Sequence, residues 1–313
     1  MSKNFAVIGV GGYIAPRHLR AIRDTNNRLV AAVDPKDSVG ILDQYSYDVK
    51  FFTEIERFDR HLEKLHRGPE EGRIHYVSIC SPNYLHDAHC RLALRAGADV
   101  ICEKPLVINP WNLEALEEIE AETKHRINTI LQLRVHPELV KLHDALQKED
   151  RIHDVDLTYI TSRGPWYQVS WKGNHEKSGG VATNIGIHFF DLLMWLFGSV
   201  SGLKVYHVDE ERMSGFIELE KARVRWYLSV DKNDLPESAK SKGKNTYRSI
   251  TVDGTDVEFS EGFTDLHTRV YEETLAGRGF GIADARPSIV LTHDIRTAPI
   301  SVRDGLVHPF LKK

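Results

Sequence analysis

Two short stretches of the sequence contain residues that can take part in proton transfer. In DVICEKP, residues 99–105, Lys104 follows an apolar run and precedes Pro105. If the run is a strand of a parallel sheet, Lys104 lies at the strand end, where such sheets bind ligands. A lysine there can hydrogen-bond a substrate hydroxyl and stabilise charge that develops on its oxygen. The triplet alone is also consistent with a surface lysine before a turn.

The second stretch is SGGVATNIGIHFFD, residues 178–191, which contains Asn184 and His188. A spacing of four residues places both on one face of a helix. Histidine is the natural general base for an alcohol, because its ordinary pKa is about 6.5. A structural interpretation stays open, in which Asp191, three residues further on, accepts a hydrogen bond from a histidine that otherwise faces the core.

A glycine-rich turn follows the first apolar run, in FAVIGVGGYIAPRH. The usual G-x-G-x-x-G spacing fails, because its third glycine falls on Ile14. Counted from Gly9 and Gly12 the pattern is G-x-x-G-x-x-A, a loop longer by one residue that ends at Ala15. Such a loop lets the backbone approach a pyrophosphate at a helix N-terminus. Asp34 closes the next strand and can accept both ribose hydroxyls, which favours NAD over NADP; a tight turn with an unrelated aspartate is the alternative.

Elements that can position these residues alternate along the first third of the chain. Apolar strand-like runs alternate with helical patterns, which predicts a doubly wound parallel sheet and so an α/β fold. After about residue 150 short strand-like runs with alternating polarity predict an antiparallel sheet, interrupted by two helices. We therefore expect a nucleotide-binding domain over residues 1–125 and an α+β domain over residues 126–313. The predicted strands cover residues 5–10, 28–34, 74–82, 99–105, 127–135, 155–162, 203–209, 215–220, 222–230, 247–253 and 255–261, and the predicted helices cover residues 17–24, 58–67, 85–97, 111–124, 186–198 and 288–298.

The composition of the chain bears on which kinds of partner the protein can bind. The 313 residues include 41 basic and 45 acidic side chains, a net charge of -4, which gives no argument for nucleic acid or an anionic membrane surface. We expect no membrane span, because no apolar run approaches about 18 residues. The three cysteines form no CxxC pair, so reduced thiols in a cytoplasmic protein are expected.

The glycine loop, Asp34, SPNYLH (residues 81–86) and CEKP (residues 102–105) together resemble the Gfo/Idh/MocA family of oxidoreductases. The resemblance implies an N-terminal Rossmann domain, a C-terminal domain with an open antiparallel sheet, and a homo-oligomer, either a dimer or a tetramer. It also implies NAD as the cofactor. The residues that it assigns to NAD are Gly9, Gly12, Tyr13, Ile14, Asp34, Ser81, Pro82, Asn83, His86, Glu103, Lys104 and Gln132.

The same resemblance implies that Lys104 and His188 are catalytic. Many relatives have aspartate where this chain has Asn184. An amide cannot stabilise an imidazolium by charge, so which of Lys104 and His188 acts as the base stays open.

A narrower resemblance lies in GYIAPRHL, EKPLVINPWN and SWKGNHEKSGGVATNIGIH. These stretches are similar to the branch of the family that oxidises the C3 hydroxyl of UDP-N-acetyl-2-amino-2-deoxy-D-glucuronate in bacterial O-antigen biosynthesis. Some members of that branch recycle NADH with 2-oxoglutarate. The lengthened loop and Asn184 are both expected there. The residues assigned to the UDP-sugar are Lys104, Arg163, Lys172, Thr183, Asn184 and His188.

Local chemistry agrees with an anionic sugar nucleotide. Residues 162–177 place Arg163 and Lys172 among tryptophans and a tyrosine. Cations can pair with a diphosphate or a uronate carboxylate, and aromatic faces can stack on a sugar or a base. A solvated basic loop is the alternative.

Three other functions stay open. The first is another NAD-dependent sugar or polyol dehydrogenase of the same family, and the second is a non-catalytic nucleotide sensor. A metal enzyme is the weakest, because His86 and His89 share a helix face but no cysteine or carboxylate completes a ligand pattern. We expect no metal.

Overall fold

The computed structural model describes residues 2–257 and 265–311 and divides into two compact units. The first unit comprises Met1–Gln132 and Thr264–Arg286, and the second comprises Leu133–Phe263 and Pro287–Lys313. The sequence predicts a second domain that begins at residue 126. In the structure the first unit extends to Gln132 and also includes a segment near the C-terminus that no local pattern assigns to it.

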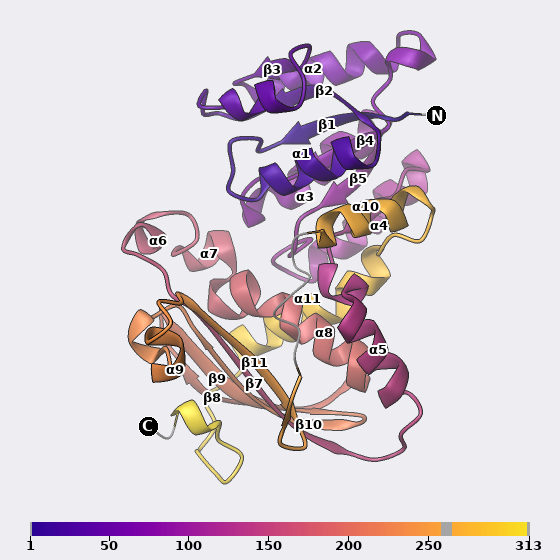
Figure 1. Ribbon diagram of the computed structural model, residues 1–313. Coiled ribbons are helices and arrows are strands. Elements are labelled where there is room, and N and C mark those ends of the chain that lie inside the picture. Colours follow the sequence, from indigo (N-terminus) through magenta and orange to yellow (C-terminus); the bar gives the residue numbers. More distant parts are fainter. Residues whose placement is uncertain (1, 258–264, 312–313) are drawn as a thin grey trace. The chain divides into compact units, whose positions relative to one another are not determined.

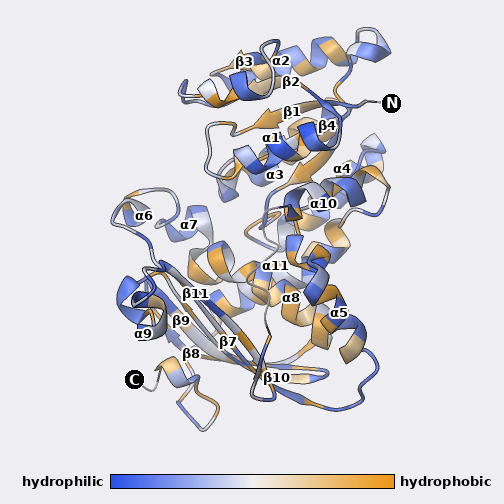
Figure 2. Cartoon of the chain, in the orientation of Figure 1, coloured by the Kyte–Doolittle hydropathy of each residue, from blue (hydrophilic) through white to orange (hydrophobic). Residues whose placement is uncertain are grey.

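The first unit is built on a six-stranded sheet in the order β3-β2-β1-β4-β5-β6, with all neighbours parallel (Figure 1). The order reverses between β1 and β4, which is where doubly wound sheets bind nucleotides. Strand β1 is fully buried and shows as hydrophobic in Figure 2. The strands are β1 (Asn4–Ile8), β2 (Arg28–Val33), β3 (Lys50–Phe52), β4 (Tyr76–Ile79), β5 (Asp99–Cys102) and β6 (Ile127–Thr129).

The helices of this unit follow the predicted apolar spacing. In the first helix Ala15, His18, Leu19 and Ile22 are buried, which is one face at intervals of three and four residues. The sequence analysis missed β3, which is only three residues long, and the helix at 266–275. The helices are α1 (Ala15–Asp24), α2 (Ile55–His66), α3 (His86–Arg95), α4 (Trp111–Thr123) and α10 (Leu266–Leu275), and α11 (Ile282–Thr297) is shared between the units.

The second unit contains a six-stranded sheet in the order β12-β11-β7-β10-β9-β8. The predicted antiparallel pairing is found between all neighbours except β7 and β10, which are parallel. A parallel pair needs a long crossover, and here the chain between the two strands includes three α-helices and two further strands. The sheet is therefore mixed. Its strands are β7 (His153–Thr161), β8 (Val200–Val208), β9 (Arg212–Leu219), β10 (Ala222–Ser229), β11 (Thr246–Val252) and β12 (Thr255–Asp256).

Two boundary predictions need comment. Residues 127–135 were predicted as one strand, but β6 ends at Thr129 and Gln132–Val135 form a 3-10 turn. Of the last predicted strand, residues 258–261 lie outside the described residues. The remaining helices are α5 (Pro137–Leu146), α6 (Trp166–Val169), α7 (His175–Ser178), α8 (Ile187–Phe197) and α9 (Glu237–Lys240).

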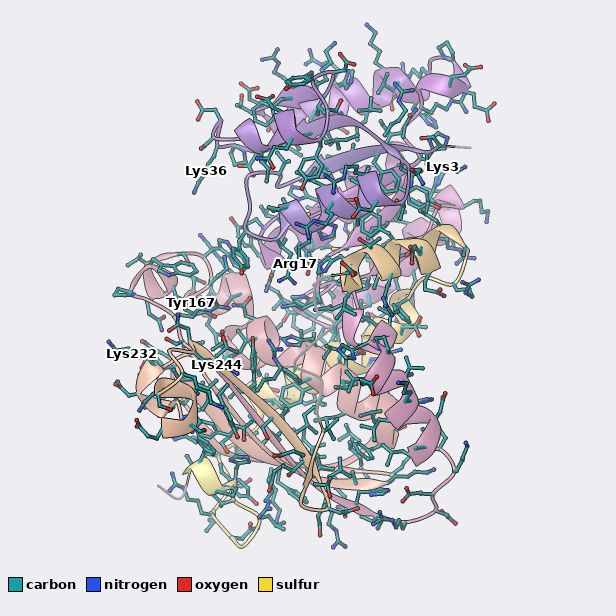
Figure 3. All side chains as sticks on the ribbon, viewed as in Figure 1. Lys3, Arg17, Lys36, Tyr167, Lys232 and Lys244 are labelled. Atoms are coloured by element: carbon teal, nitrogen blue, oxygen red, sulfur yellow. The ribbon has the colours of Figure 1, made fainter. Side chains whose placement is uncertain are left out.

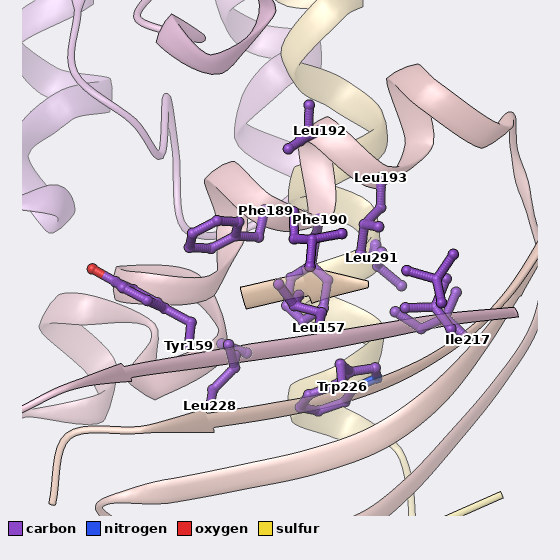
Figure 4. Close-up of a cluster of buried hydrophobic side chains, with 14 of the residues drawn as sticks. Leu157, Tyr159, Phe189, Phe190, Leu192, Leu193, Ile217, Trp226, Leu228 and Leu291 are labelled. Carbon is purple, nitrogen blue, oxygen red and sulfur yellow. The ribbon is translucent and has the colours of Figure 1, made fainter. Parts of the chain in front are cut away.

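Helix α8 packs on the inner face of the second sheet and forms the core of the unit (Figure 4). Phe190 meets the ring of Trp226 edge-on at a centroid distance of 5.4 Å, beside Leu157. By length and composition alone His175–Phe197 could cross a membrane, but 72% of its most apolar 18-residue stretch is buried inside the protein. Burial of this extent is typical of a core helix.

Candidate functional site

The glycine loop adopts a conformation that only glycine allows at its first position. Gly9 has φ of +84°, and a Cβ there would lie 2.7 Å from the backbone nitrogen of Ser81. The loop is closed by hydrogen bonds from Gly12 N to Gly9 O and from Ala15 N to Gly12 O. Helix α1 begins at Ala15, which is fully buried, as the lengthened spacing predicts. Ala15 N and Arg17 N donate to carbonyls of this turn and Pro16 has no N–H, so among the described residues the N–H groups of Tyr13 and Ile14, just before the helix, are the ones left to bind phosphate.

Asp34 lies directly after β2 and is tied to this loop. Its Oδ2 accepts a hydrogen bond from Gly11 N at 2.9 Å, and its Oδ1 accepts one from Lys36 N at 2.9 Å. Each carboxylate oxygen can accept a further bond, so the side chain keeps capacity for two ribose hydroxyls. These features fit a bound NAD.

The turn after β4 is fixed by two histidines. His86 is fully buried, and its ring nitrogens lie 2.8 Å from Ser81 O and 2.7 Å from Pro105 O. Burial lowers the pKa of His86. His89 Nδ1 lies 2.8 Å from Ser81 Oγ. The rings therefore connect the SPN turn to the turn after Lys104, and a direct contact of His86 with NAD stays a prediction.

Glu103, predicted to contact the cofactor, is the centre of a buried polar network. Its Oε1 lies 3.0 Å from His18 Nε2 and 2.8 Å from His267 Nε2. Burial opposes ionisation, but the hydrogen bonds from the two histidines prevail and hold the pKa of Glu103 well below its usual range. Its Oε2 accepts a hydrogen bond from the backbone N–H of Lys104 at 3.2 Å. The carboxylate is therefore an anchor next to the proposed catalytic lysine.

The network continues away from Glu103. Tyr271 Oη lies 2.7 Å from His18 Nδ1 and 2.6 Å from Ser78 Oγ. Ligand atoms of His18, Glu103 and His267 lie within 4.8 Å of one another, and two histidines with a carboxylate are a donor set that zinc accepts. The hydrogen bonds account for this arrangement without an ion, because two ring N–H groups satisfy one carboxylate.

In the second unit, Asn184 is paired with a tyrosine. It lies in a π-helical turn, Ala182–Gly186, that leads into α8. Its Nδ2 donates to Tyr167 Oη at 2.7 Å. Tyr167 is 3% exposed, and burial raises its pKa, so the hydroxyl stays protonated and keeps its own hydrogen for another acceptor. π-helical turns occur frequently at functional sites.

His188 lies in the first turn of α8 with aromatic neighbours. Its ring meets the Tyr159 ring edge-on at a centroid distance of 5.6 Å and the Phe189 ring at a tilt of 41° and 4.4 Å. Asp191, the partner in the structural interpretation, accepts two hydrogen bonds from Arg134 at 3.0 and 2.6 Å. The Asp191 carboxylate therefore forms an ion pair with the Arg134 guanidinium through both of its oxygens.

The cationic residues predicted to bind substrate lie in the loop after β7. Lys172 Nζ lies 4.4 Å from the ring of Trp171 and 5.6 Å from that of Trp166. Arg163 N donates to Val230 O, which joins this loop to the end of β10. The predicted interleaving of cations and aromatic rings is thus present as cation–π contacts.

Two other residues are predicted to contact a ligand, Thr183 the substrate and Gln132 the NAD. Among the described residues, Thr183 Oγ1 and Gln132 Oε1 are buried without a hydrogen-bond partner. Such atoms are costly unless something binds them. This agrees with the predicted roles of Thr183 at the substrate and Gln132 at NAD, which stay predictions.

Sequence reasoning did not identify His18, His267, Tyr271, Tyr159 or the pairing of Tyr167 with Asn184. His267 is 164 positions from Glu103, and no spacing rule relates them. For His18, a sequence signal exists: its position on the apolar face of the helix after the glycine loop indicates a buried histidine near the nucleotide site.

Two sequence profiles of one protein family match this chain, one in each unit. Residues 3–130 match the sequence profile described as oxidoreductase family, NAD-binding Rossmann fold, and residues 150–256 match the profile of the C-terminal alpha/beta domain of the same family. Inositol 2-dehydrogenase of Rhizobium meliloti is 27% identical over 63% of this chain, and the match spans 56% of that protein, just over half of its length.

Solved structures give a fuller match. The WlbA (WbpB) dehydrogenase from Thermus thermophilus, in complex with NAD and alpha-ketoglutarate, is 51% identical over 98% of this chain and 99% of its own, with a TM-score of 0.95. Its complex with NAD and UDP-GlcNAcA gives 50% identity over the same shares and a TM-score of 0.94.

Proposed function

The chain belongs to the Gfo/Idh/MocA oxidoreductase family, and on that premise we propose that it oxidises the C3 hydroxyl of UDP-N-acetyl-2-amino-2-deoxy-D-glucuronate to a ketone, for bacterial O-antigen synthesis. The observation that supports this substrate is the 50% identity, over nearly the whole chain, with a dehydrogenase that binds NAD and UDP-GlcNAcA. The glycine loop and Asp34 fit NAD as described above.

In this proposal His188 accepts the proton of the C3 hydroxyl. Lys104 donates a hydrogen bond to the substrate and stabilises the negative charge that develops on its oxygen. NAD, when bound, accepts the hydride that leaves C3, so that a C=O bond replaces the C–H and O–H bonds. Arg163, Lys172, Thr183 and Asn184 hold the substrate.

We extend the proposal to the return of the cofactor to its oxidised form. The Thermus dehydrogenase forms a complex with NAD and alpha-ketoglutarate. In this chain 2-oxoglutarate would accept the hydride and a proton and become 2-hydroxyglutarate. Stopped-flow absorbance tests this step, since enzyme-bound NADH should be oxidised on mixing with 2-oxoglutarate; a stable NADH signal would contradict it.

The oxidation itself is tested with the purified full chain, NAD and two substrates. We expect NADH to form with the UDP-uronate and not with myo-inositol, and the Lys104→Ala variant to lose at least about 100-fold in turnover. Lys141→Ala, in an exposed pair with Glu138, is the matched control. Turnover with myo-inositol alone would favour the second candidate, a polyol dehydrogenase, which the match to inositol 2-dehydrogenase supports.

We also propose that the enzyme works in the cytoplasm, where both nucleotide substrates are available and its three buried cysteines stay reduced. A homotetramer is the proposed assembly. Light scattering coupled to size exclusion should give four times the 35.7 kDa chain mass, and a monomer would contradict the assembly.

A further inference from the structure

Helix α10 places two polar side chains against the buried face of α1. His267 and Tyr271 are four residues apart and therefore lie on one face of α10. The His18 ring meets both of them edge-on, at centroid distances of 5.2 Å for His267 and 5.7 Å for Tyr271. Arg17, labelled in Figure 3, is exposed on α1, whereas the next residue, His18, is fully buried. The two helices therefore enclose a polar contact that water does not reach.

The hydrogen bonds around His18 form a chain with one direction. Glu103 is ionised, as described above, so its Oε1 can only accept, and His18 Nε2, 3.0 Å away, is the donor. Burial lowers the pKa of His18, so the ring is neutral and its Nδ1 carries no hydrogen. Burial raises the pKa of Tyr271 well above its usual value, so its hydroxyl keeps its hydrogen and donates it to His18 Nδ1 at 2.7 Å. Ser78 Oγ, 2.6 Å from Tyr271 Oη, is then the donor to the tyrosine oxygen.

Each donor in this chain depends on its protein neighbour. Ser78, His18 and Tyr271 are all 0% exposed, so water cannot replace a hydrogen bond that is lost. The His18 ring is held at both of its nitrogens and cannot rotate without losing both bonds. It therefore holds Glu103 Oε1 in one position.

The chain ends at the backbone of the proposed catalytic lysine. Glu103 Oε2 accepts a hydrogen bond from Lys104 N at 3.2 Å, while Oε1 of the same carboxylate is held by the two histidines. The peptide that carries the Lys104 side chain is thereby fixed relative to α1 and α10. Because α1 directly follows the glycine loop, the same contacts relate this lysine to the loop that is proposed to bind the pyrophosphate of NAD.

We propose that Ser78, Tyr271 and His18 form a hydrogen-bond chain that positions Lys104 for the oxidation, with Tyr271 and His18 as positioning residues that act through Glu103. This inference rests on the proposed function, which gives Lys104 its catalytic role. Misplacement of a catalytic group by about 1 Å can cost about 100-fold in rate, so bonds that restrict its backbone affect turnover. Tyr271 matters more than Ser78, because only Tyr271 donates directly to the His18 ring.

Steady-state kinetics of the full chain with NAD and the UDP-uronate tests the positioning. Tyr271→Phe removes one hydroxyl and keeps the ring, and we expect kcat to fall about tenfold while KM for NAD and for the nucleotide sugar stay within about twofold. Ser78→Ala leaves the Tyr271 hydroxyl able to donate to His18, so kcat should fall by no more than about twofold. His18→Gln offers an amide donor to Glu103 and an amide acceptor to Tyr271, and it should keep more activity than His18→Ala.

A double variant separates positioning from folding. Tyr271→Phe leaves the buried Ser78 hydroxyl without its partner and Ser78→Ala removes that hydroxyl, so the double variant should have a higher urea midpoint than Tyr271→Phe alone. Its kcat should stay as low as that of Tyr271→Phe, because His18 still lacks its donor. Tyr76→Phe, at a ring that stacks on Phe5 as the Tyr271 ring does, is the matched control and should keep wild-type kcat. A kcat that follows the urea midpoint across these variants would indicate a purely structural role and overturn the proposal.

The tautomer of His18 gives an independent test. In a long-range proton–nitrogen correlation spectrum of the chain with isotope-labelled histidine, at about pH 7, the signals that His18→Gln removes should come from a protonated Nε2 and an unprotonated Nδ1. A protonated Nδ1 would reverse the chain and overturn the proposal. If the wild type oxidises myo-inositol and not the UDP-uronate, the proposed function fails, and the kcat of the same variants with myo-inositol still decides whether the chain positions Lys104.

Discussion

His267 Nε2 lies 2.8 Å from Glu103 Oε1, although the two residues are 164 positions apart in the chain. This contact joins α10 to the end of β5, one residue before Lys104. His18, from the helix after the phosphate loop, approaches the same oxygen. The carboxylate thus connects the proposed NAD-binding helix, the proposed catalytic lysine and a distant segment within one unit.

Removal of His267 should cost both stability and activity. His267→Ala takes one of two donors from a buried carboxylate, so we expect a loss of about 1–3 kcal/mol in the free energy of unfolding, measured by urea titration, and a lower kcat. His267→Gln can replace the Nε2 donor and should restore part of both. His207→Ala, at a partly exposed pair with Asp209, is the control. Equal stability of the two alanine variants would contradict the role of Glu103 as an anchor.

The pairing of Asn184 with Tyr167 predicts a second effect. Tyr167→Phe removes the hydroxyl that accepts the 2.7 Å hydrogen bond from Asn184 Nδ2, so a buried donor loses that bond. We expect the free energy of unfolding to fall by about 1–3 kcal/mol and KM for the nucleotide sugar to rise.

Asn184→Asp should lower the free energy of unfolding less than Tyr167→Phe does, because the Tyr167 hydroxyl can turn and donate to the new carboxylate. The new charge should also favour protonated His188 and shift the acid limb of the pH–rate profile to higher pH. An unchanged profile would contradict a shared site for residues 184 and 188. Tyr47→Phe, at a tyrosine that is 87% exposed in the first unit, is the control.

The two glycines of the phosphate loop should differ in their tolerance of a methyl group. Gly9→Ala forces an alanine to φ of +84° and places its Cβ 2.7 Å from Ser81 N, so we expect a loss of more than about 2 kcal/mol. At Gly12 the conformation is ordinary and the nearest atom is 3.1 Å away, so a smaller loss is expected. Gly40→Ala, with nothing within 4 Å, should be neutral. Thermal unfolding without NAD ranks the three; equal effects at Gly9 and Gly40 would contradict the loop conformation.

The parts of the fold with local signals were predictable. Alternating strands and helices have strong periodicity, which predicts the Rossmann sheet and the existence of a second, largely antiparallel sheet. The parallel pairing of β7 with β10 was not predictable, because strand polarity depends on the crossover and not on the residues of either strand. The three-residue β3 is too short for any period.

For the site, sequence reasoning found residues within motifs and missed their partners. Gly9, Asp34 and Glu103 follow strands, where a rule relates position to ligand. His267 meets Glu103 through a contact across the tertiary fold, and no motif marks it. The role of Tyr167 depends on one hydrogen bond to Asn184, 17 positions away, which no periodicity specifies.

His308 predicts how stability depends on pH. It is 1% exposed, its Nδ1 accepts a hydrogen bond from Phe310 N at 3.2 Å, and its Nε2 lies 3.2 Å from Thr158 Oγ1, so the neutral ring fits the site. Burial, with Arg225 adding to it, lowers the pKa of His308 to about 3. Below its ordinary value of 6.5 the unfolded chain binds a proton that the folded chain does not. The free energy of unfolding therefore falls as the pH drops from 6.5 toward 3, by up to about 1.4 kcal/mol per pH unit for this group.

The variant His308→Asn isolates this contribution, because its Oδ1 can accept the Phe310 N–H without titrating. Urea unfolding between about pH 7 and pH 5 should show wild type losing about 2 kcal/mol more than the variant over that interval. Other buried histidines with lowered pKa, including His18 and His86, add the same loss to both proteins and cancel in the difference. Equal slopes for wild type and His308→Asn would show that His308 titrates normally in the folded protein.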